Sequence, residues 1–157
     1  MKKIVLIIFI LLFSITQSFA CSCADSDTSL YKKIQNAFNE SDLILTGKVI
    51  AKELKSNGTH QNSGDPIIYT IEIISVIKGI KKSEVIQIAS EMSESNCGYP
   101  FEIGKAYLVY ATSSTHFSSK TGNDFNFVTS LCYRNQKLSI VKGKEFRILK
   151  RLARRMF

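Results

Sequence analysis

Histidine is scarce in this sequence, and the motifs that organise common catalytic sites are absent. The two histidines, His60 and His116, lie in polar segments rich in serine, and neither has a neighbour at the spacing of a metal-ligand pair. No His-Glu-x-x-His, Gly-x-Ser-x-Gly or phosphate-binding glycine motif occurs. The sequence therefore predicts a protein that is not an enzyme and that has no cofactor of its own.

Long apolar segments are also scarce. The longest run, residues 4–13, is far shorter than the ~20 residues that span a bilayer, so no transmembrane segment is expected in the mature chain. Two lysines precede this run, and small residues stand at Ser18 and Ala20. This pattern predicts a secretory signal peptide over residues 1–20, cleaved before Cys21. The mature part, residues 21–157, has no visible repeat or linker and is expected to form one domain.

All four cysteines follow the predicted leader, which indicates an oxidising compartment and two disulfides. Four cysteines allow three pairings, and composition does not choose among them. We expect a secreted, extracellular protein, or a periplasmic or cell-envelope protein if the source is bacterial. Loss of Lys2 and Lys3 with the leader leaves 19 basic and 13 acidic side chains, a net charge of +6. Such a charge favours an acidic matrix or envelope surface as a partner, whereas nucleic acid is not expected for an exported protein.

The hydrophobic periodicity changes along the mature chain. Helical spacing of apolar residues predicts a short helix over residues 28–39 and a basic amphipathic helix over residues 142–157. We expect the second helix to dock its apolar stripe on the domain, although such helices also lie on membrane surfaces. Between the helices, β-branched and alternating segments predict five strands, at residues 43–51, 67–78, 84–90, 106–111 and 125–132. Five short, antiparallel-looking strands with a helix at each end favour a mainly β fold, a closed five-stranded OB-type β-barrel.

Several segments resemble a known family in a fixed order. Cys21-Ser22-Cys23-Ala24 would stand at the mature N-terminus, followed by a Gly47-containing first strand, a Cys97-Gly98-Tyr99 segment and a later lone cysteine, Cys132. This constellation resembles the tissue inhibitors of metalloproteinases, whose inhibitory domain is a netrin-like module on an OB-type barrel. The third disulfide of animal members and their cysteine-rich second domain have no counterpart here. The resemblance therefore implies a minimal inhibitory module.

The resemblance also implies site residues. It pairs Cys21 with Cys97 and Cys23 with Cys132. It assigns to the α-amine and carbonyl of Cys21 the chelation of the catalytic zinc of a partner metalloendopeptidase, so that Cys21 contacts a metal only in the partner. Ser22 would point into the specificity pocket of the protease. Further protease contacts are expected from the next residues of the chain and from the segment tied to the terminus through Cys97, namely Cys23, Ala24, Ser95, Asn96 and Gly98, with the loop at residues 55–65 as a third contact.

Three other interpretations use the same residues differently. The chain could be an extracellular or envelope-associated netrin-like binding module without inhibitory activity. A bacterial lipoprotein signal would place a lipid on the Cys21 thiol and an acyl group on its amine, although Ser18 and Phe19 depart from such signals. Cys21 and Cys23 could also form a thiol metal site or redox pair, but no further ligands cluster near them in the sequence.

Overall fold

The computed structural model describes residues 21–23, 28–56, 61, 64–79, 83–123 and 126–156. The predicted signal peptide and Ala24 lie outside these ranges. The helices are α2 (Leu30–Glu40), α3 (Ser118–Thr121) and α4 (Gly143–Ala153), with short 3-10 turns η1 (Glu94–Asn96) and η2 (Leu138–Ile140). The strands are β1 (Leu43–Leu54), β2 (Pro66–Lys78), β3 (Val85–Glu91), β4 (Ala106–Ser114), β5 (Asn126–Val128) and β6 (Gln136–Lys137). No helix in the described ranges is long and apolar enough to cross a membrane.

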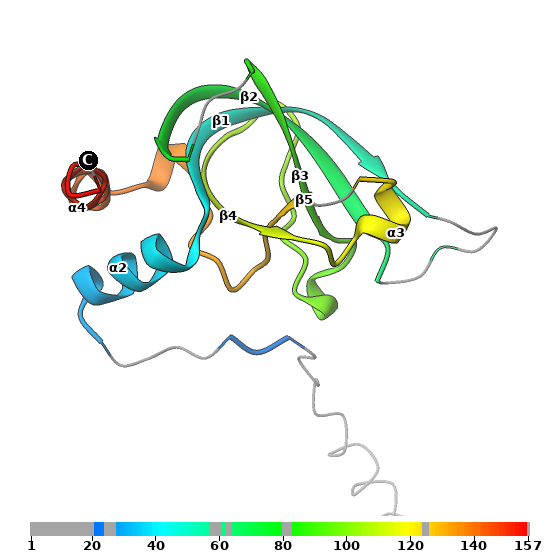
Figure 1. Cartoon of the computed structure of the whole chain (residues 1–157), viewed down its shortest axis with the longest axis horizontal. Helices are drawn as coiled ribbons and strands as arrows, with labels where there is room; N and C mark the ends of the chain where they lie inside the picture. The colour runs from blue at the N-terminus through cyan, green and yellow to red at the C-terminus, as the bar shows by residue number, and fades with distance from the viewer. Residues whose placement is uncertain are drawn as a thin grey trace, which may run out of the picture.

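Five strands are joined by hydrogen bonds into a ring, in the order β1, β2, β3, β5, β4 and back to β1. Figure 1 shows the long, curved β1 and β2 sweeping around one side of this ring. Gly47 permits the close approach of the two strands, because a Cβ at this position would lie 2.4 Å from Ile71 Cγ2 and 2.7 Å from the Glu72 carbonyl oxygen. The fold is thus mainly β, as expected, with a helix before the ring and another after it.

Two expectations about the strands need correction. The sheet is mixed, because β3 and β5 run parallel, and β6 adds a sixth strand to β4. The fifth strand, predicted over residues 125–132, ends at Val128, because β5 covers Asn126–Val128 and residues 129–132 are not in a strand; residue 125 lies outside the described ranges. Beyond Val128, the Thr129 N–H still donates to the Ala89 carbonyl, but the chain then turns and the buried side chain of Asn135 bonds to the Ser130 carbonyl. These local polar bonds replace the strand ladder and end β5 early.

The apolar core lies inside the ring. Side chains at alternate positions of the strands meet there with Phe101, and the fully buried ones include Leu45, Val49, Ile71 and Val109. A second cluster lies on the outer face of β1 and β4, where α2 and α4 cover the sheet; its buried members are Ile34, Ala37, Phe38, Ile44, Leu108, Tyr110, Ile148, Leu149 and Leu152. The helices explain why residues 43–47 are buried without interruption although strand side chains alternate between faces.

The buried carboxylate of Glu145 joins α4 to the sheet. Glu145 is 4 % exposed and bonds to Arg134 Nη2 at 3.0 Å, to Gln136 Nε2 at 3.0 Å and to the hydroxyl of Tyr110 at 2.9 Å. Burial, followed by the nearby Glu145 carboxylate, raises the pKa of Tyr110, so the phenol stays protonated and donates. The apolar stripe of α4 is docked on the domain, as expected, and this polar contact sets its orientation.

Candidate functional site

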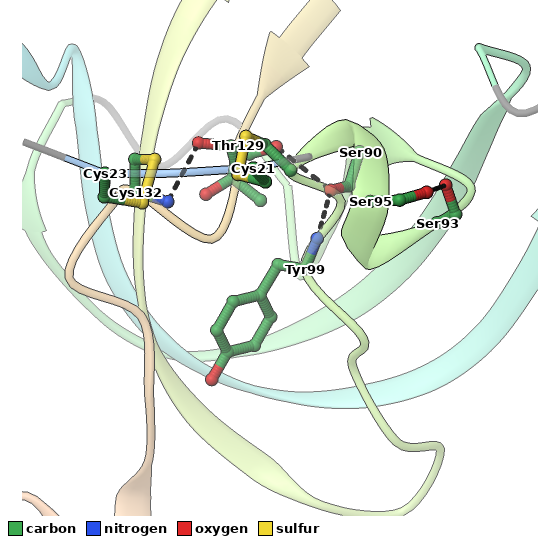
Figure 2. Close-up of a disulfide and its surroundings, with 10 residues drawn as sticks. Cys21, Cys23, Ser90, Ser93, Ser95, Tyr99, Thr129 and Cys132 are labelled. Carbon is green, nitrogen blue, oxygen red and sulfur yellow. Dashed lines mark hydrogen bonds between the residues drawn. A yellow bond between two sulfur atoms is a disulfide. The ribbon is translucent and has the colours of Figure 1, made fainter. Parts of the chain in front are cut away.

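Two disulfides hold the described segment 21–23. One joins Cys21 to Cys97 across 76 residues, and the other joins Cys23 to Cys132 across 109 residues, each with a Cα–Cα distance of 5.2 Å. This is the same pairing that the family resemblance implies. Figure 2 shows the segment lying across two loops, the one after η1 and the one after β5. Two anchors in three residues leave this segment little freedom to fray.

The two bridges lie next to each other. The Sγ atoms of Cys21, Cys23 and Cys132 are all within 4.8 Å of one another. All four cysteines are in disulfides, so these sulfurs are not the thiolates that bind metals or exchange disulfides. Ser22 lies between the two anchored cysteines and is exposed. The edge formed by residues 21–23 therefore presents one small polar side chain and backbone groups, held rigidly from both sides.

The loop that carries Cys97 is itself tightly built. Cys97 adopts a left-handed conformation, with a φ of 65°, and its N–H donates to the Glu94 carbonyl. The N–H of Gly98 donates to the Ser93 carbonyl at 2.8 Å. Ser95 and Asn96, two of the predicted contact residues, are exposed in η1, which directly precedes Cys97. Gly98 is buried behind them, so its contribution is the space that it leaves for the backbone.

Gly98 marks the closest backbone approach near the site. A Cβ at this position would stand 2.1 Å from the Glu91 carbonyl oxygen and 2.9 Å from that of Ser93. We expect Gly98→Ala to lower the free energy of unfolding by about 2–3 kcal/mol, because backbone atoms must move to accept the methyl group. Urea unfolding would measure this loss, with Gly143→Ala as the control, since a Cβ at Gly143 meets nothing within 4 Å. An equal effect of the two substitutions would contradict the steric explanation.

Buried polar side chains support the two anchoring loops. Ser90 Oγ accepts from the Tyr99 N–H at 2.8 Å and donates to the Thr129 carbonyl at 3.0 Å, which ties the Cys97 loop to the Cys132 loop (Figure 2). Asn135 Nδ2 donates to Thr129 Oγ1 at 2.7 Å, and the Asn135 Oδ1 accepts from the Tyr110 N–H at 2.9 Å. Ser90, Thr129 and Asn135 are each less than a tenth exposed. Sequence reasoning missed these three residues, because single small polar residues carry no periodic signal.

Tyr99 continues this support toward the core. Its ring packs at 4.5 Å from that of Phe101 and at 6.1 Å from that of Tyr107, measured between centroids. Burial, then the neighbouring Tyr107 and Glu102, raise the pKa of Tyr99 to about 12. The phenol therefore stays protonated at neutral pH and donates to the Asn135 carbonyl at 3.3 Å. The residue after Gly98 thus fixes the base of the Cys97 loop.

The remaining predicted contacts are partly outside the described ranges. Ala24 is outside them, and so are residues 57–60 and 62–63 of the loop expected to form a third contact. Among the described candidates, the disulfides hold residues 21–23 beside Cys97 and Cys132, whereas Ser95 and Asn96 are exposed in η1, the turn that directly precedes Cys97, and Gly98 is buried. Residues 21–23 offer a rigid segment of backbone hydrogen-bond donors and acceptors with small side chains.

Comparison with known proteins gives a consistent result. A protein-family model described as tissue inhibitor of metalloproteinase matches residues 19–145. The chain is 29 % identical over 125 residues to metalloproteinase inhibitor 3 of Xenopus laevis, covering 79 % of this chain and 51 % of that protein. It is 31 % identical over 94 residues to metalloproteinase inhibitor 3 of Scyliorhinus torazame, covering 59 % and 39 %. The chain spans about half the length, or less, of these relatives.

Proposed function

Because the chain belongs to the tissue inhibitor of metalloproteinase family, we propose that it inhibits a zinc metalloendopeptidase through its mature N-terminus. Family members are inhibitors and not enzymes, and the relatives named above are metalloproteinase inhibitors. The observation that carries the proposal is the anchoring of Cys21 and Cys23 by two disulfides to separate loops. An inhibitor that inserts a chain terminus into a cleft needs that terminus to be rigid.

The proposed mechanism uses the backbone of Cys21. Cleavage after Ala20 leaves a free α-amine on this residue, next to its own carbonyl oxygen, and the two atoms can close a five-membered ring on a metal. A catalytic zinc has three protein ligands and one open position, which normally holds water or substrate. The amine and the carbonyl oxygen together would displace the catalytic water, and the zinc of the partner would then have five ligands. The zinc belongs to the protease, so the inhibitor needs no metal of its own.

The affinity that so small a contact gives depends on how rigid the N-terminal segment is before it binds. Ordering a flexible chain end on binding costs about 1–2 kcal/mol per residue in backbone entropy, and residues 21–23 would largely avoid this cost because the disulfides order them beforehand. Ser22 would enter the specificity pocket of the protease. The exposed Ser95 and Asn96 in η1 would make the second contact.

We also propose that the chain has the netrin-like fold of this family. The closed ring of five strands, filled by one apolar cluster, supports a netrin-like barrel of OB type. Residues 21–157 would form this single domain after removal of a secretory signal at residues 1–20. Two disulfides fit an extracellular or periplasmic location. In the structure the Cys21 sulfur is bonded to Cys97, which favours an inhibitor over a lipoprotein acylated at that thiol.

The proposal is tested by titrating the signal-cleaved protein against a panel of zinc endopeptidases, with serine endopeptidases as controls. We expect inhibition at a ratio of one inhibitor to one enzyme, confined to the zinc enzymes. Intact mass measured on the same preparation establishes that the N-terminus is Cys21 without a lipid. An unmodified protein that inhibits none of the zinc enzymes would instead favour a netrin-like binding module.

Replacement of Ser22 tests the specificity contact. We expect Ser22→Gly to raise the inhibition constant about fivefold, because the variant loses a hydroxyl contact worth about 1 kcal/mol in the pocket. The thermal unfolding temperature should not change, since Ser22 is exposed. Ser139→Gly, at an exposed position in η2, is the matched control and should inhibit like the parent protein. Unchanged inhibition by the Ser22 variant would remove this residue from the contact.

A further inference from the structure

Arginine is concentrated at one place in the chain. The sequence has five arginines, and Arg134 is used in the buried pair with Glu145. The other four lie on α4 or directly after it and, with Lys150, line an open depression of about 440 Å³; the five are Arg147, Lys150, Arg151, Arg154 and Arg155. The residues follow the helical spacing of one exposed face. We call these five residues the arginine surface.

Within the part of the chain that the structure describes, the cations of the arginine surface form no ion pair. Some basic side chains elsewhere in the described chain form ion pairs, such as Lys120 with Asp65 and Lys137 with Glu102. No carboxylate in the described ranges lies within ion-pair distance of any of the five cations. Like charges at i and i+4 on a helix repel one another. The arginine surface is therefore slightly unfavourable in the isolated protein and is available to an anionic partner.

The two ends of α4 carry exposed apolar side chains. Ile140, three residues before the helix, is 66 % exposed, and Met156, three residues after it, is 58 % exposed. The apolar stripe of α4 itself is buried against α2 and the sheet, so the helix cannot insert into a bilayer by that face. What its exposed face presents is the cluster of five cations, while Ile140 and Met156 are exposed near the two ends of the helix. Adjacent cations with exposed apolar side chains nearby suit a lipid interface, where phosphate groups lie above an apolar layer.

We propose that the arginine surface docks the protein peripherally on a bilayer rich in anionic phospholipids. Four of the five cations are arginines, whose planar guanidinium groups bind phosphate oxygens in pairs. Clusters of this size bind anionic lipid surfaces, and each charge near the surface strengthens binding about fivefold. Because the attraction is electrostatic, salt screens it within about 10 Å at 0.1 M ionic strength.

The docked protein would keep its N-terminal edge free. Figure 1 shows α4 at one end of the molecule, beside α2, whereas residues 21–23 lie apart from it below the ring. Membrane docking and protease inhibition would therefore use separate surfaces. The inference does not depend on the proposed inhibitory activity, and each can fail without the other.

Vesicle sedimentation with the signal-cleaved protein tests the inference. The probes are vesicles of phosphatidylcholine alone and vesicles that also contain phosphatidylglycerol. We expect the parent protein to bind only the second kind and to be released by added salt. A variant with Arg147→Gln, Arg151→Gln and Arg154→Gln should bind about 100-fold more weakly, the product of about fivefold for each lost charge. All three side chains are exposed, so the variant should fold normally.

A matched control separates the arginine surface from the general charge. The variant with Lys48→Gln, Lys52→Gln and Lys105→Gln loses the same three charges from exposed positions on and near β1 and should lose far less binding. Equal loss in the two variants would overturn the proposal, because net charge would then explain the binding. Failure of the parent protein to prefer phosphatidylglycerol would also overturn it. So would binding to a sulfated polysaccharide without binding to the anionic vesicles.

Discussion

One additional alanine before Cys21 is expected to weaken inhibition at least about 1000-fold without changing the fold. The added residue moves the α-amine away from the carbonyl of Cys21, so the five-membered chelate on the zinc can no longer form. A loss of about 4 kcal/mol is typical of removing a central anchoring contact, and this equals about three orders of magnitude in affinity. Inhibition constants of the parent protein and the extended form, measured on the same metalloendopeptidase, would give the ratio.

The control for this change is an alanine added after Phe157, at the other end of the chain. It adds the same mass and should leave inhibition unchanged. The thermal unfolding temperatures of both extended forms should match that of the parent protein, because neither addition touches the core or the disulfides. If the form extended before Cys21 inhibits as well as the parent, the chelation mechanism is wrong, even if the protein is an inhibitor.

Removal of the disulfide between Cys23 and Cys132 is expected to have the largest effect on stability. This bridge closes a loop of 109 residues. Chain entropy predicts that the double variant Cys23→Ser with Cys132→Ser loses about 4–5 kcal/mol in free energy of unfolding. Inhibition should weaken too, because the terminus then has one anchor and can fray. Urea unfolding and inhibition titration of the same preparation would measure the two effects together.

The second bridge is a natural comparison for the first. The loop closed between Cys21 and Cys97 has 76 residues, and the logarithmic dependence on length predicts a stability loss within about 0.3 kcal/mol of that for the longer loop. A double variant Cys21→Ser with Cys97→Ser should therefore unfold at nearly the same urea concentration. A loss below about 1 kcal/mol in both variants would show that the bridges do not act through the unfolded chain.

Much of the fold was predictable, because the spacing of apolar residues along the sequence indicates which side chains a strand or a helix buries. The alternation from Leu43 to Val49 predicted the first strand, and helical spacing predicted α2 and α4 within a few residues of their bounds. The parallel pairing of β3 with β5 was not predictable in this way. A strand in a parallel pair and one in an antiparallel pair show the same alternation of side chains. The fifth strand was predicted but not its early end, because the turn that ends it depends on the contacts of Asn135, one of them with the distant Tyr110.

The candidate site was predictable only where its residues follow the order of motifs known from the family. The segment from Cys21 to Cys23 was recognisable by its place after the leader and by the later cysteines. Ser90 and Thr129 could not be found, because their importance arises from a bond between two residues 39 apart in sequence, one in β3 and one in the loop after β5. Gly98 was expected as a surface contact, whereas the structure buries it against the Glu91 carbonyl.

The sequence by itself determined where the long strands and the two main helices lie, how many cysteines are available to pair and how many positive charges the chain carries. These properties depend on composition and on neighbours a few residues apart. Only the tertiary structure decided that the loops after η1 and β5 meet at the terminal segment, and that four arginines form no ion pair with the described residues. Strand order and loop contact come from pairing between distant residues, which side-chain periodicity does not encode. The rigid edge at residues 21–23 is therefore a property of the closed ring and its two bridges.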